Sequence, residues 1–334
     1  MNKDAIDLFC GCGGLTLGLA LAGFDVVAGA DAWKPAIETY RANNPAHEAL
    51  EMDLSDEDAT YGLILRYRPF LVAGGPPCQD FSIAGAKTEG QRADMTVKYA
   101  RAIARAKPPA FIMENVPRAS LSDAYRTARK VFKDAGYGVT TRVVDAIEAG
   151  VPQYRKRLFM VGMLGEKDGF LETEFMTDVP CLPVTVKEHL DDAIKAEFYY
   201  RHPRTYGRRA IYSVHEPSPT IRGVNRPRPA SYRKHPADKA DPEEAEALDY
   251  RQRALIQTFP PSYIWPDGFK KSEYDLMVGN AVPVLLAAHV AGKLFRFAAE
   301  VRNMFEADVV YLHDPATRTG PAVEEQQEFL LAAE

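Results

Sequence analysis

Residues 6–14, IDLFCGCGG, decide the fold, because a short apolar strand is predicted to run here into a glycine-rich turn. Apolar residues at helical spacing follow from 15 to 22, and a second strand is predicted over 24–30. Glycines at such a turn allow a ligand to approach the backbone closely. The pattern therefore predicts the first unit of an α/β sheet, and the turn suits either a ligand site or a plain tight turn.

The same alternation continues along the first half of the chain. Further buried strands are predicted over 70–73, 111–113 and 158–161, and helices over 34–43 and 96–106. Strands that alternate with helices predict a parallel sheet covered on both faces.

Composition limits the class of protein. The 334 residues carry a net charge of −5, with 46% hydrophobic and 26% charged residues, which is typical of a folded, water-soluble protein. The four cysteines lack the spacing of a disulfide framework or a zinc site, so we expect reduced thiols and no metal. The first residues do not resemble a signal peptide, and no apolar stretch approaches the roughly 20 residues that span a bilayer. We expect a cytoplasmic location.

A second, irregular region is predicted from about residue 164 to 253, where prolines, arginines and tyrosines replace periodic patterns. Between residues 201 and 234, nine basic residues occur with a single acid, so this stretch carries +8 in an acidic chain. The six acids between 238 and 249 are expected on a solvated surface. After Pro283, residues 284–301 predict a helix that packs on a core.

Cys78 follows a predicted buried strand, two glycines and the rigid pair Pro76-Pro77. A lone cysteine is most often a small buried hydrophobe. Here the stiff approach, together with the polar residues Gln79, Asp80 and Ser82 that follow, favours a presented thiol.

Glu114 comes directly after the apolar residues 111–113, so a buried strand would deliver its carboxylate to the edge of the sheet. A thiol that faces a carboxylic acid suggests covalent catalysis on an electrophilic ring. The alternative role for Glu114 is an ion pair with Arg155 or Arg157. On a strand, Gln153, Arg155 and Arg157 would share one face, which suits either an anionic or carbonyl-bearing ligand or a solvated edge.

Three residues near the ends of the early strands are candidates for a nucleotide-like ligand. Asp31 suits ribose hydroxyls, or alternatively the N-cap of a helix. Trp33 suits stacking on an adenine, or packing on the core. Asp53 lies near the end of a third strand, where an acid can accept a hydrogen bond from an amino group.

Taken in order, these motifs resemble the DNA cytosine-5 methyltransferase family, and the resemblance extends from Asp7 to Pro283. Each motif is moderately specific, and five in this order are highly specific. They are Asp7-Leu8-Phe9 with Gly11, Gly13 and Gly14; residues 75–82, GPPCQDFS; Glu114-Asn115-Val116; Gln153-x-Arg155-x-Arg157; and residues 279–283, GNAVP.

The resemblance implies an α/β fold with a Rossmann-like S-adenosylmethionine-dependent methyltransferase domain over 1–163. A smaller, irregular target-recognition domain would cover residues 164–250. Residues 251–305 would return to the catalytic domain, and residues 306–334 would form a polar acidic tail. The implied cofactor is S-adenosylmethionine, which leaves as S-adenosylhomocysteine, with Phe9 and Asp53 at its adenine and Asp31 at its ribose. The implied cofactor site comprises Asp7, Phe9, Gly11, Gly13, Gly14, Leu15, Asp31, Trp33, Asp53, Leu54, Pro77, Asn280 and Val282.

The chain departs from the family pattern at two places. Residues 93–96 match the family's Asp-x-Arg pattern only loosely, at Asp94. Ala32 occupies the hydrophobic position after Asp31, so Trp33 lies one residue late.

The family chemistry assigns roles to the catalytic residues. By resemblance, Cys78 adds to C6 of a cytosine that is flipped out of the duplex, which makes C5 nucleophilic. Glu114 would hold N3 and the exocyclic amine, and Arg157 would bind the O2 carbonyl with Arg155 beside it.

The implied partner is double-stranded DNA, and no membrane is involved. The resemblance is to enzymes of bacterial or phage type, which implies a monomer. In some systems such an enzyme has a cognate restriction endonuclease that acts on the same site. Arginine is the usual reader of guanine, so the basic stretch would face DNA. The implied DNA-binding residues are Gln79, Ser82, Gln153, Arg209, Thr220, Arg222, Arg226 and Arg228.

Two rival functions stay open. A transfer-RNA cytosine-5 methyltransferase shares the scaffold, but its branch typically has threonine after the phenylalanine, where this chain has Ser82. A catalytically silent DNA-binding relative would not require Cys78, Glu114 and Arg157 together.

Overall fold

The computed structural model describes residues 2–77, 89–177, 182–203, 205 and 207–301, with the main chain alone for 89–94 and 300–301. The chain forms two compact units that do not follow chain order. Unit 1 comprises residues 1–144, 156–179 and 287–334, and unit 2 comprises residues 145–155 and 180–286. The division by function predicted from the sequence stays a prediction.

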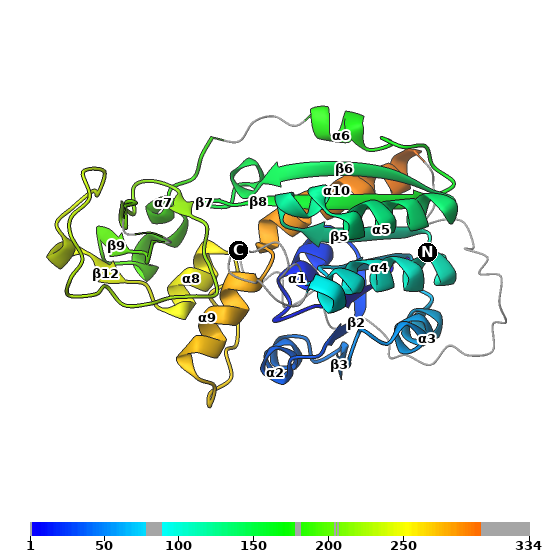
Figure 1. Ribbon diagram of the computed structural model, residues 1–334, viewed down its shortest axis with the longest axis horizontal. Helices are drawn as coiled ribbons and strands as arrows, with labels where there is room; N and C mark the ends of the chain where they lie inside the picture. The colour runs from blue at the N-terminus through cyan, green and yellow to red at the C-terminus, as the bar shows by residue number, and fades with distance from the viewer. Residues whose placement is uncertain (1, 78–88, 178–181, 204, 206, 302–334) are drawn as a thin grey trace. The chain divides into compact units, whose positions relative to one another are not determined.

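Unit 1 is built on a seven-stranded sheet with the order β3-β2-β1-β4-β5-β8-β6 (Figure 1). The first five strands in this order are parallel, which confirms the predicted α/β architecture. The strands are β1 (Asp4–Leu8), β2 (Asp25–Asp31), β3 (Glu48–Glu51), β4 (Leu71–Gly74), β5 (Ala110–Asn115), β6 (Tyr137–Asp145) and β8 (Lys156–Leu164).

Strand β8 differs from the predicted parallel arrangement, because it runs antiparallel to β5. In this register Glu114 lies opposite Phe159, and Asn115 lies opposite Leu158. The amino end of β8 therefore meets the carboxyl end of β5. Since side chains alternate along a strand, Arg157 projects from the same face as Phe159 and lies diagonally across from Glu114.

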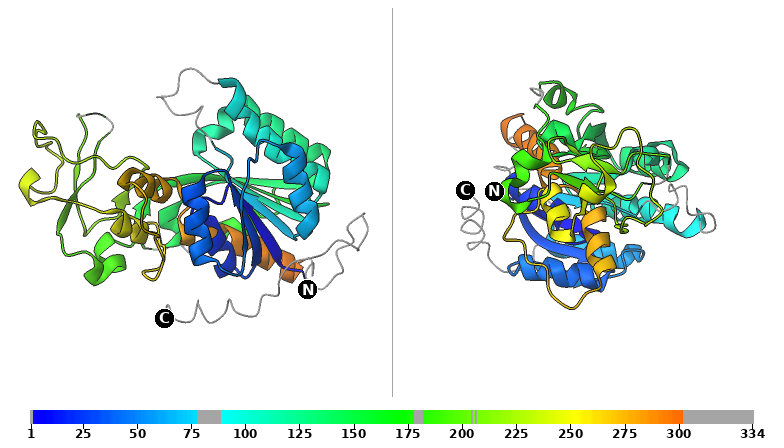
Figure 2. Two further views of the ribbon diagram at one scale, coloured as in Figure 1. Left: turned by 90° about the horizontal axis from the view of Figure 1, so that it is seen from below. Right: turned by 90° about the vertical axis from the view of Figure 1, so that its left-hand side faces the viewer.

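Helices cover both faces of this sheet. Figure 2 shows α3, α4 and α5 on one face, and α1, α2 and the unit 1 part of α10 on the other. Their bounds are α1 (Gly14–Leu21), α2 (Lys34–Asn43), α3 (Glu57–Tyr67), α4 (Glu89–Ala106), α5 (Asp123–Asp134), α6 (Glu172–Met176) and α10 (Val284–Arg296), with a 3-10 turn over Pro117–Leu121 and a π turn over Phe297–Val301.

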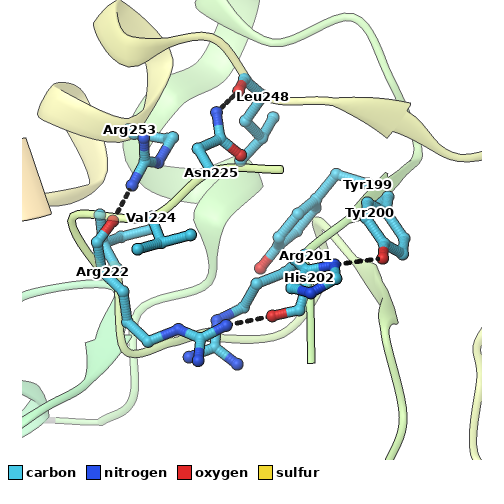
Figure 3. A pocket seen from close by; sticks show the side chains of 10 residues that line it. Tyr199, Tyr200, Arg201, His202, Arg222, Val224, Asn225, Leu248 and Arg253 are labelled. Atoms are coloured by element: carbon cyan, nitrogen blue, oxygen red, sulfur yellow. Dashed lines mark hydrogen bonds between the residues drawn. The ribbon is translucent and has the colours of Figure 1, made fainter. Parts of the chain in front are cut away.

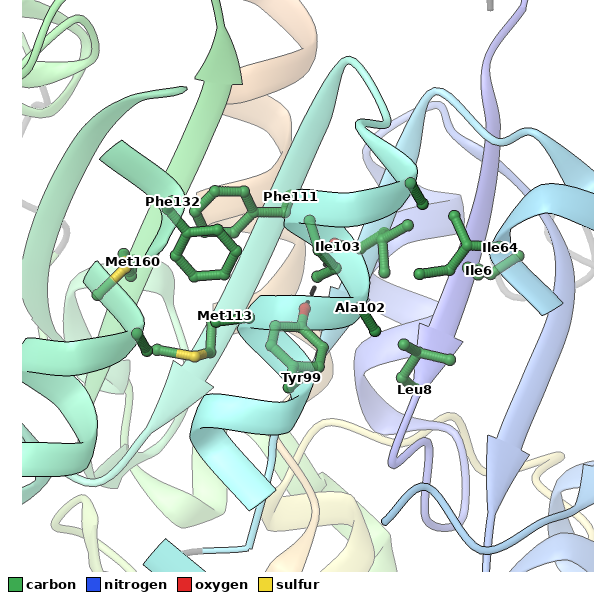
Figure 4. Close-up of a cluster of buried hydrophobic side chains, with 14 of the residues drawn as sticks. Ile6, Leu8, Ile64, Tyr99, Ala102, Ile103, Phe111, Met113, Phe132 and Met160 are labelled. Carbon is green, nitrogen blue, oxygen red and sulfur yellow. Dashed lines mark hydrogen bonds between the residues drawn. The ribbon is translucent and has the colours of Figure 1, made fainter. Parts of the chain in front are cut away.

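The main core of unit 1 lies between the sheet and the layer of α3, α4 and α5 (Figure 4). The rings of Phe111 and Phe132 stack with their centroids 3.7 Å apart. The buried Tyr99 hydroxyl donates to the Ile112 carbonyl at 2.9 Å, which satisfies its polar atom inside the core. This packing holds the carboxyl ends of β4 and β5 in place.

Unit 2 has short elements, as its proline content predicts. A three-stranded sheet has the order β10-β9-β12, and β11 pairs with β7 in parallel. A small core gathers around Tyr200, Ile211 and Tyr232. The elements are a 3-10 turn over Ala146–Ala149, β7 (Gln153–Tyr154), α7 (Val186–Leu190), a 3-10 turn over Asp191–Ala193, β9 (Phe198–Tyr200), β10 (Ile211–Ser213), β11 (Ser218–Pro219), a 3-10 turn over Pro242–Glu244, β12 (Glu246–Ala247), α8 (Tyr250–Ile256) and α9 (Lys271–Asn280).

Within the described residues, the stretch 271–299 is long and apolar enough to cross a membrane by length and composition, and an 18-residue window inside it has a mean hydropathy of 1.4. This corrects the expectation that no stretch approaches that length. The stretch consists of α9 and α10 with a break at residues 281–283, and 61% of its apolar window is buried in the structure, as in the core helix of a water-soluble protein.

Candidate active site

The glycine-rich turn after β1 is tied to the end of β2 by one carboxylate. Asp31 accepts hydrogen bonds from the backbone N–H of Gly11 at 3.0 Å and from that of Trp33 at 2.8 Å. The φ angles of Gly11 (55°) and Gly13 (93°) are left-handed, which explains glycine at both positions. The N-cap of α2 is Trp33, so the alternative of Asp31 as the N-cap residue is wrong.

Beneath the turn, Asp7 is fully buried. Its Oδ2 accepts a hydrogen bond from the Thr16 hydroxyl at 2.7 Å, and its Oδ1 has no hydrogen-bond partner among the described residues. Burial, together with a smaller effect of the nearby Asp31 carboxylate, raises the pKa of Asp7 to about 7. The carboxyl group is therefore close to half-protonated at neutral pH.

This pKa predicts a pH-dependent stability. Between pH 4 and 7 the folded chain holds the Asp7 proton and the unfolded chain does not, so the free energy of unfolding falls as pH rises. Asp7→Asn removes this loss. The loss in the wild type is about 1.4 kcal/mol per pH unit. In urea titrations from pH 5 to 8, the free energy of unfolding of the variant should therefore rise relative to that of the wild type by on the order of 3 kcal/mol. A difference that does not change with pH would contradict the assignment.

The residues on either side of the turn are buried or half-buried. Phe9 adopts a left-handed φ of 61°, which is uncommon for a residue with a side chain, and its ring centroid lies 6.3 Å from that of Tyr99. Gly14 and Leu15 begin α1 and are buried. The strained conformation at Phe9 occurs at the ligand site predicted from the sequence, as such conformations often do.

The other predicted cofactor residues of unit 1 lie at strand and helix ends. Trp33 is half-buried at the start of α2. Asp53 follows β3 with an exposed carboxylate, and the Ser55 backbone N–H lowers its pKa, so it is ionised at neutral pH. Leu54 is buried beside it, and the half-buried Pro77 is the last described residue before the gap.

At the ends of β5 and β8, Arg157 Nε lies 2.8 Å from Glu114 Oε1. The side chains of Arg157 and Glu114 are 15% and 12% exposed, so the pair is largely shielded but reaches the surface. The ion pair between Glu114 and Arg157, predicted as the alternative role of Glu114, is therefore confirmed. It does not exclude a second role, because a carboxylate has about four acceptor positions.

The main chain that leads to Cys78 passes this pair. A Cβ atom on Gly75 would lie 3.0 Å from Glu114 Oε2, so glycine allows the chain to approach the carboxylate. Asn115 Nδ2 donates to the Pro76 carbonyl at 3.2 Å and holds the next residue. In the sequence Asn115 is marked only as part of the Glu114-Asn115-Val116 motif, and no local pattern predicts this anchor.

Cys78, Gln79 and Ser82 lie outside the described residues, and so do the side chains around Asp94. The thiols of Cys10 and Cys12 are buried in the glycine-rich turn. Burial raises the pKa of Cys12 to about 12 and that of Cys10 well above its usual value. Neither thiol can supply a thiolate at neutral pH.

In unit 2, a chain of buried amides links three segments. The backbone N–H of Ile221 donates to Gln153 Oε1 at 2.8 Å, and Gln153 Nε2 donates to Gln257 Oε1 at 2.7 Å. Gln257 Nε2 then donates to the Val278 carbonyl at 2.7 Å. Both glutamine side chains are fully buried, so Gln153 is engaged inside unit 2 in this structure, and its contact with DNA stays a prediction.

Arg155 joins the same segments through its guanidinium group. It is 1% exposed and donates to the carbonyls of Ile221 at 2.7 Å and of Gly279 and Ala281, each at 3.0 Å. Gln153, Arg155 and Arg157 are buried or half-buried, whereas Tyr154 and Lys156 between them are exposed, as the predicted alternation requires. The shared face is therefore not a solvated edge.

Gly279, in the last of the five motifs, allows two backbones to meet. A Cβ atom at this position would lie 1.9 Å from the backbone N of Gly223 and 2.1 Å from the carbonyl carbon of Arg222. Asn280 is exposed at the end of α9, and Val282 is buried.

Gly279→Ala should therefore destabilise unit 2 by about 1–3 kcal/mol or more, because backbone atoms must move. Thermal unfolding should show a melting temperature several degrees below that of the wild type. Gly207→Ala is the matched control, since a Cβ atom there meets nothing within 4 Å. Equal melting temperatures for the two variants would exclude the close approach.

Several of the arginines expected at DNA are engaged within unit 2. Arg209 pairs with Glu216 and stacks over the Tyr212 ring at 4.1 Å. Arg228 lies 3.7 Å from Glu243. Five of the six acids that follow the basic stretch are exposed, as expected, and two of these, Asp241 and Glu243, form ion pairs with Lys234 and Arg228 that neutralise part of it.

Among the other predicted DNA-binding residues, Arg222 and Thr220 donate hydrogen bonds to backbone carbonyls and Arg226 is exposed. The Arg222 guanidinium donates to the His202 carbonyl. The Thr220 hydroxyl donates to the Tyr154 carbonyl at 2.7 Å. Arg226 is exposed, and no hydrogen bond or ion pair is formed by its side chain within the described part of unit 2.

No group of three or more histidine, cysteine, aspartate or glutamate side chains suited to a metal ion occurs among the residues that the structure describes.

Comparison with solved structures supports the fold. A DNA modification methyltransferase encoded within an E. coli prophage superposes with a TM-score of 0.63 at 22% identity, covering 89% of this chain and 99% of that chain. The S. pombe Dnmt2 methyltransferase superposes with a TM-score of 0.64 at 16% identity, covering 89% and 98%. At these identities the likeness concerns the fold alone.

Comparison of sequences reaches further. The type II methyltransferase M.HgiDI of Herpetosiphon aurantiacus is 46% identical over 300 residues, covering 89% of this chain and 96% of the relative. M.HindV of Haemophilus influenzae is 43% identical over 306 residues, covering 90% and 99%. The family model for C-5 cytosine-specific DNA methylase matches residues 4–296. The chain therefore belongs to the C-5 cytosine-specific DNA methylases.

Proposed function

We propose that this protein transfers a methyl group from S-adenosylmethionine to C5 of a flipped-out cytosine in a specific sequence of double-stranded DNA. The observation that carries the proposal is the Glu114–Arg157 pair beside the main chain that leads to Cys78. An acid and a guanidinium that are adjacent suit the N3 and O2 atoms of cytosine, which are also adjacent.

The glycine-rich turn fits the cofactor. At Gly11 a Cβ atom would meet nothing within 4 Å, so the turn is open on that side. The ionised Asp53 suits an amino group, and Asp31 suits ribose hydroxyls while it holds the turn. Asp7, Phe9, Gly13, Gly14, Leu15, Trp33, Leu54, Pro77, Asn280 and Val282 complete the proposed site. When bound, S-adenosylmethionine supplies the electrophilic methyl group.

The chain's own residues perform the other steps. The Cys78 thiolate adds to C6, and the electron pair of the C5–C6 bond becomes available at C5. Glu114 holds N3 and the exocyclic amine, which stabilises the charge that develops on the ring. Arg157 binds O2 and keeps the Glu114 carboxylate in place through their ion pair. After methylation, loss of the C5 proton expels Cys78.

Arg155 takes a different role from that expected. Its guanidinium binds three carbonyl groups inside unit 2 and contacts no substrate in this account, so we assign it as a positioning residue. It holds the segment that contains Thr220 and Arg222 against the turn that contains Asn280.

Unit 2 would supply target recognition, through Thr220, Arg226 and the Arg222 main chain, and Gln79 and Ser82 would also contact DNA. The names of the relatives M.HgiDI and M.HindV suggest a type II restriction–modification system, with a cognate endonuclease that acts on the same site. We propose a cytoplasmic monomer that uses no metal.

The test is methyl transfer from tritiated S-adenosylmethionine to duplex DNA and, separately, to total transfer RNA. We expect incorporation into duplex DNA, recovered as 5-methyldeoxycytidine after nuclease digestion. Incorporation into transfer RNA alone would establish the first rival, and none into either substrate would favour the silent DNA-binding relative.

A further inference from the structure

Thr258 ends helix α8 at a position where glycine is usual. Its φ angle is 63°, in the left-handed region. The backbone N–H of Thr258 donates to the Leu255 carbonyl at 2.8 Å and that of Phe259 to the Ala254 carbonyl at 3.1 Å, which are the two hydrogen bonds of a Schellman motif. A residue that branches at Cβ is an outlier in this conformation, whereas glycine adopts it freely. Thr258 therefore carries backbone strain that glycine would remove.

The Thr258 hydroxyl connects the end of α8 to the start of α10. It donates to the Gln257 carbonyl at 2.7 Å and accepts the backbone N–H of Leu285 at 3.0 Å. The Gln257 carbonyl also accepts the backbone N–H of Val284 at 3.0 Å. Val284 and Leu285 are the first two residues of α10, and the first N–H groups of a helix have no partner within it. Gln257 and Thr258 therefore cap α10 from another segment of the chain.

Helix α8 gives this cap a fixed base. Arg253 in α8 donates to the Arg222 carbonyl (Figure 3) and pairs with Asp275 in α9, and both side chains of that ion pair are buried. The rings of Tyr250 in α8 and Tyr274 in α9 stack with their centroids 4.3 Å apart. The residue that caps α10 therefore follows a helix that is fastened to α9.

The turn between α9 and α10 contains the last of the five motifs and is fastened through its main chain. Gln257 Nε2 donates to the Ala281 carbonyl at 3.2 Å, and the Arg155 guanidinium donates to the same carbonyl at 3.0 Å. The cap on α10 holds the far end of the turn. The side chains of Asn280 and Val282 take no part in these hydrogen bonds, so the main chain fixes the turn and leaves both side chains for another use.

We propose that Thr258 is a positioning residue for S-adenosylmethionine, because its cap on α10 fixes the turn that presents Asn280 and Val282. The inference rests on the proposed function, which places these two side chains at the cofactor. It also accounts for threonine at a strained position, since strain persists where the surrounding structure and function require it. Glycine would relieve the strain but would lose the cap.

The expected effect on cofactor binding follows from the loss of one fixed end. Without the Thr258 hydroxyl, the start of α10 frays and the turn is ordered in only a fraction of the molecules. The cofactor must then order the turn as it binds, so the apparent dissociation constant rises by the inverse of that fraction.

The test measures the dissociation constant of S-adenosylmethionine by calorimetry with the full-length protein. Thr258→Val keeps the branched shape but removes the hydroxyl, and it should weaken binding about fivefold, the factor that corresponds to one lost helix cap. Thr258→Ser keeps the hydroxyl and should bind as wild type. Thr185→Val is the matched control, because it makes the same change at the N-cap of α7, also in unit 2, where the hydroxyl accepts the Glu188 N–H at 3.1 Å. It should leave the dissociation constant unchanged.

Thr258→Gly separates positioning from stability. Glycine relieves the left-handed φ, so this variant should melt at a higher temperature than Thr258→Val. It supplies no hydroxyl to Leu285, so its affinity for S-adenosylmethionine should be as weak as that of Thr258→Val. An affinity that recovers together with the melting temperature would show that Thr258 acts through stability alone and would overturn the proposal.

Two further results would also overturn the proposal. One is wild-type affinity in Thr258→Val, and the other is equal weakening by Thr258→Val and Thr185→Val. A wild type that binds no S-adenosylmethionine would instead overturn the proposed function itself, which separates the two failures.

Discussion

Cys78→Ala should abolish methyl transfer to cytosine, with a loss in rate of at least about 10⁴-fold. Without the thiolate, no nucleophile adds at C6, and C5 of cytosine is too weak a nucleophile to take a methyl group. Cys10 and Cys12 cannot replace it, since burial keeps both thiols protonated at neutral pH. The measurement is tritiated methyl incorporation into duplex DNA under single-turnover conditions.

Two observations should accompany that loss. The variant should still bind S-adenosylmethionine and duplex DNA, because Cys78 is not needed to hold either. On a duplex that carries 5-fluorocytosine, wild type should form an adduct that survives denaturation, since fluorine cannot leave C5 as a proton does, whereas Cys78→Ala should form none. Cys181→Ala is the matched control and should behave as wild type. Retained transfer by Cys78→Ala would exclude the covalent mechanism.

Glu114→Gln should reduce methyl transfer by about 10²–10⁴-fold. The amide keeps the shape of the side chain but carries no charge to stabilise the ring and no acidic proton for N3. It also leaves Arg157 without the carboxylate that lies 2.8 Å from its Nε. The measurement is the single-turnover rate, together with thermal unfolding of the same preparations.

A double variant separates catalysis from the alternative of a structural ion pair. If Glu114 and Arg157 serve only as a structural ion pair, then Glu114→Gln with Arg157→Met should recover both stability and rate, because no unpaired charge remains. The proposed mechanism predicts recovered stability and no recovery of rate. Glu57→Gln is the control, since Glu57 forms an ion pair with Arg101 on the surface at 3.4 Å and should keep full activity.

Local patterns predicted most of the elements of unit 1. Helix α2 agrees with the predicted range, and the strands around the glycine-rich turn and before Gly75 agree to within two residues. The antiparallel direction of β8 was not predictable from alternation, because strand direction depends on pairing partners far apart in the chain. That direction brings Arg157 beside Glu114, a contact that residue types alone left open between Arg155 and Arg157.

The sequence predicts which residue types form the candidate site. It predicts less well which of them are buried and what they contact. Gln153 and Arg155 look like ligand-facing residues in sequence, since polar side chains alternate there, yet both are buried among carbonyl and amide groups of unit 2. The +8 stretch suggested a uniform DNA surface. Its pairing with acids such as Glu243, which come later in the chain, appears only in three dimensions.

The central claim is methylation of cytosine at C5 within a defined DNA sequence. Bisulfite sequencing of DNA from cells that express the wild type tests it most directly, with cells that express Cys78→Ala as the control. The account predicts protected cytosines at one position of a recurring short sequence in the wild type and none in the variant. Protection that is absent from the wild type, or that persists in the variant, would contradict it.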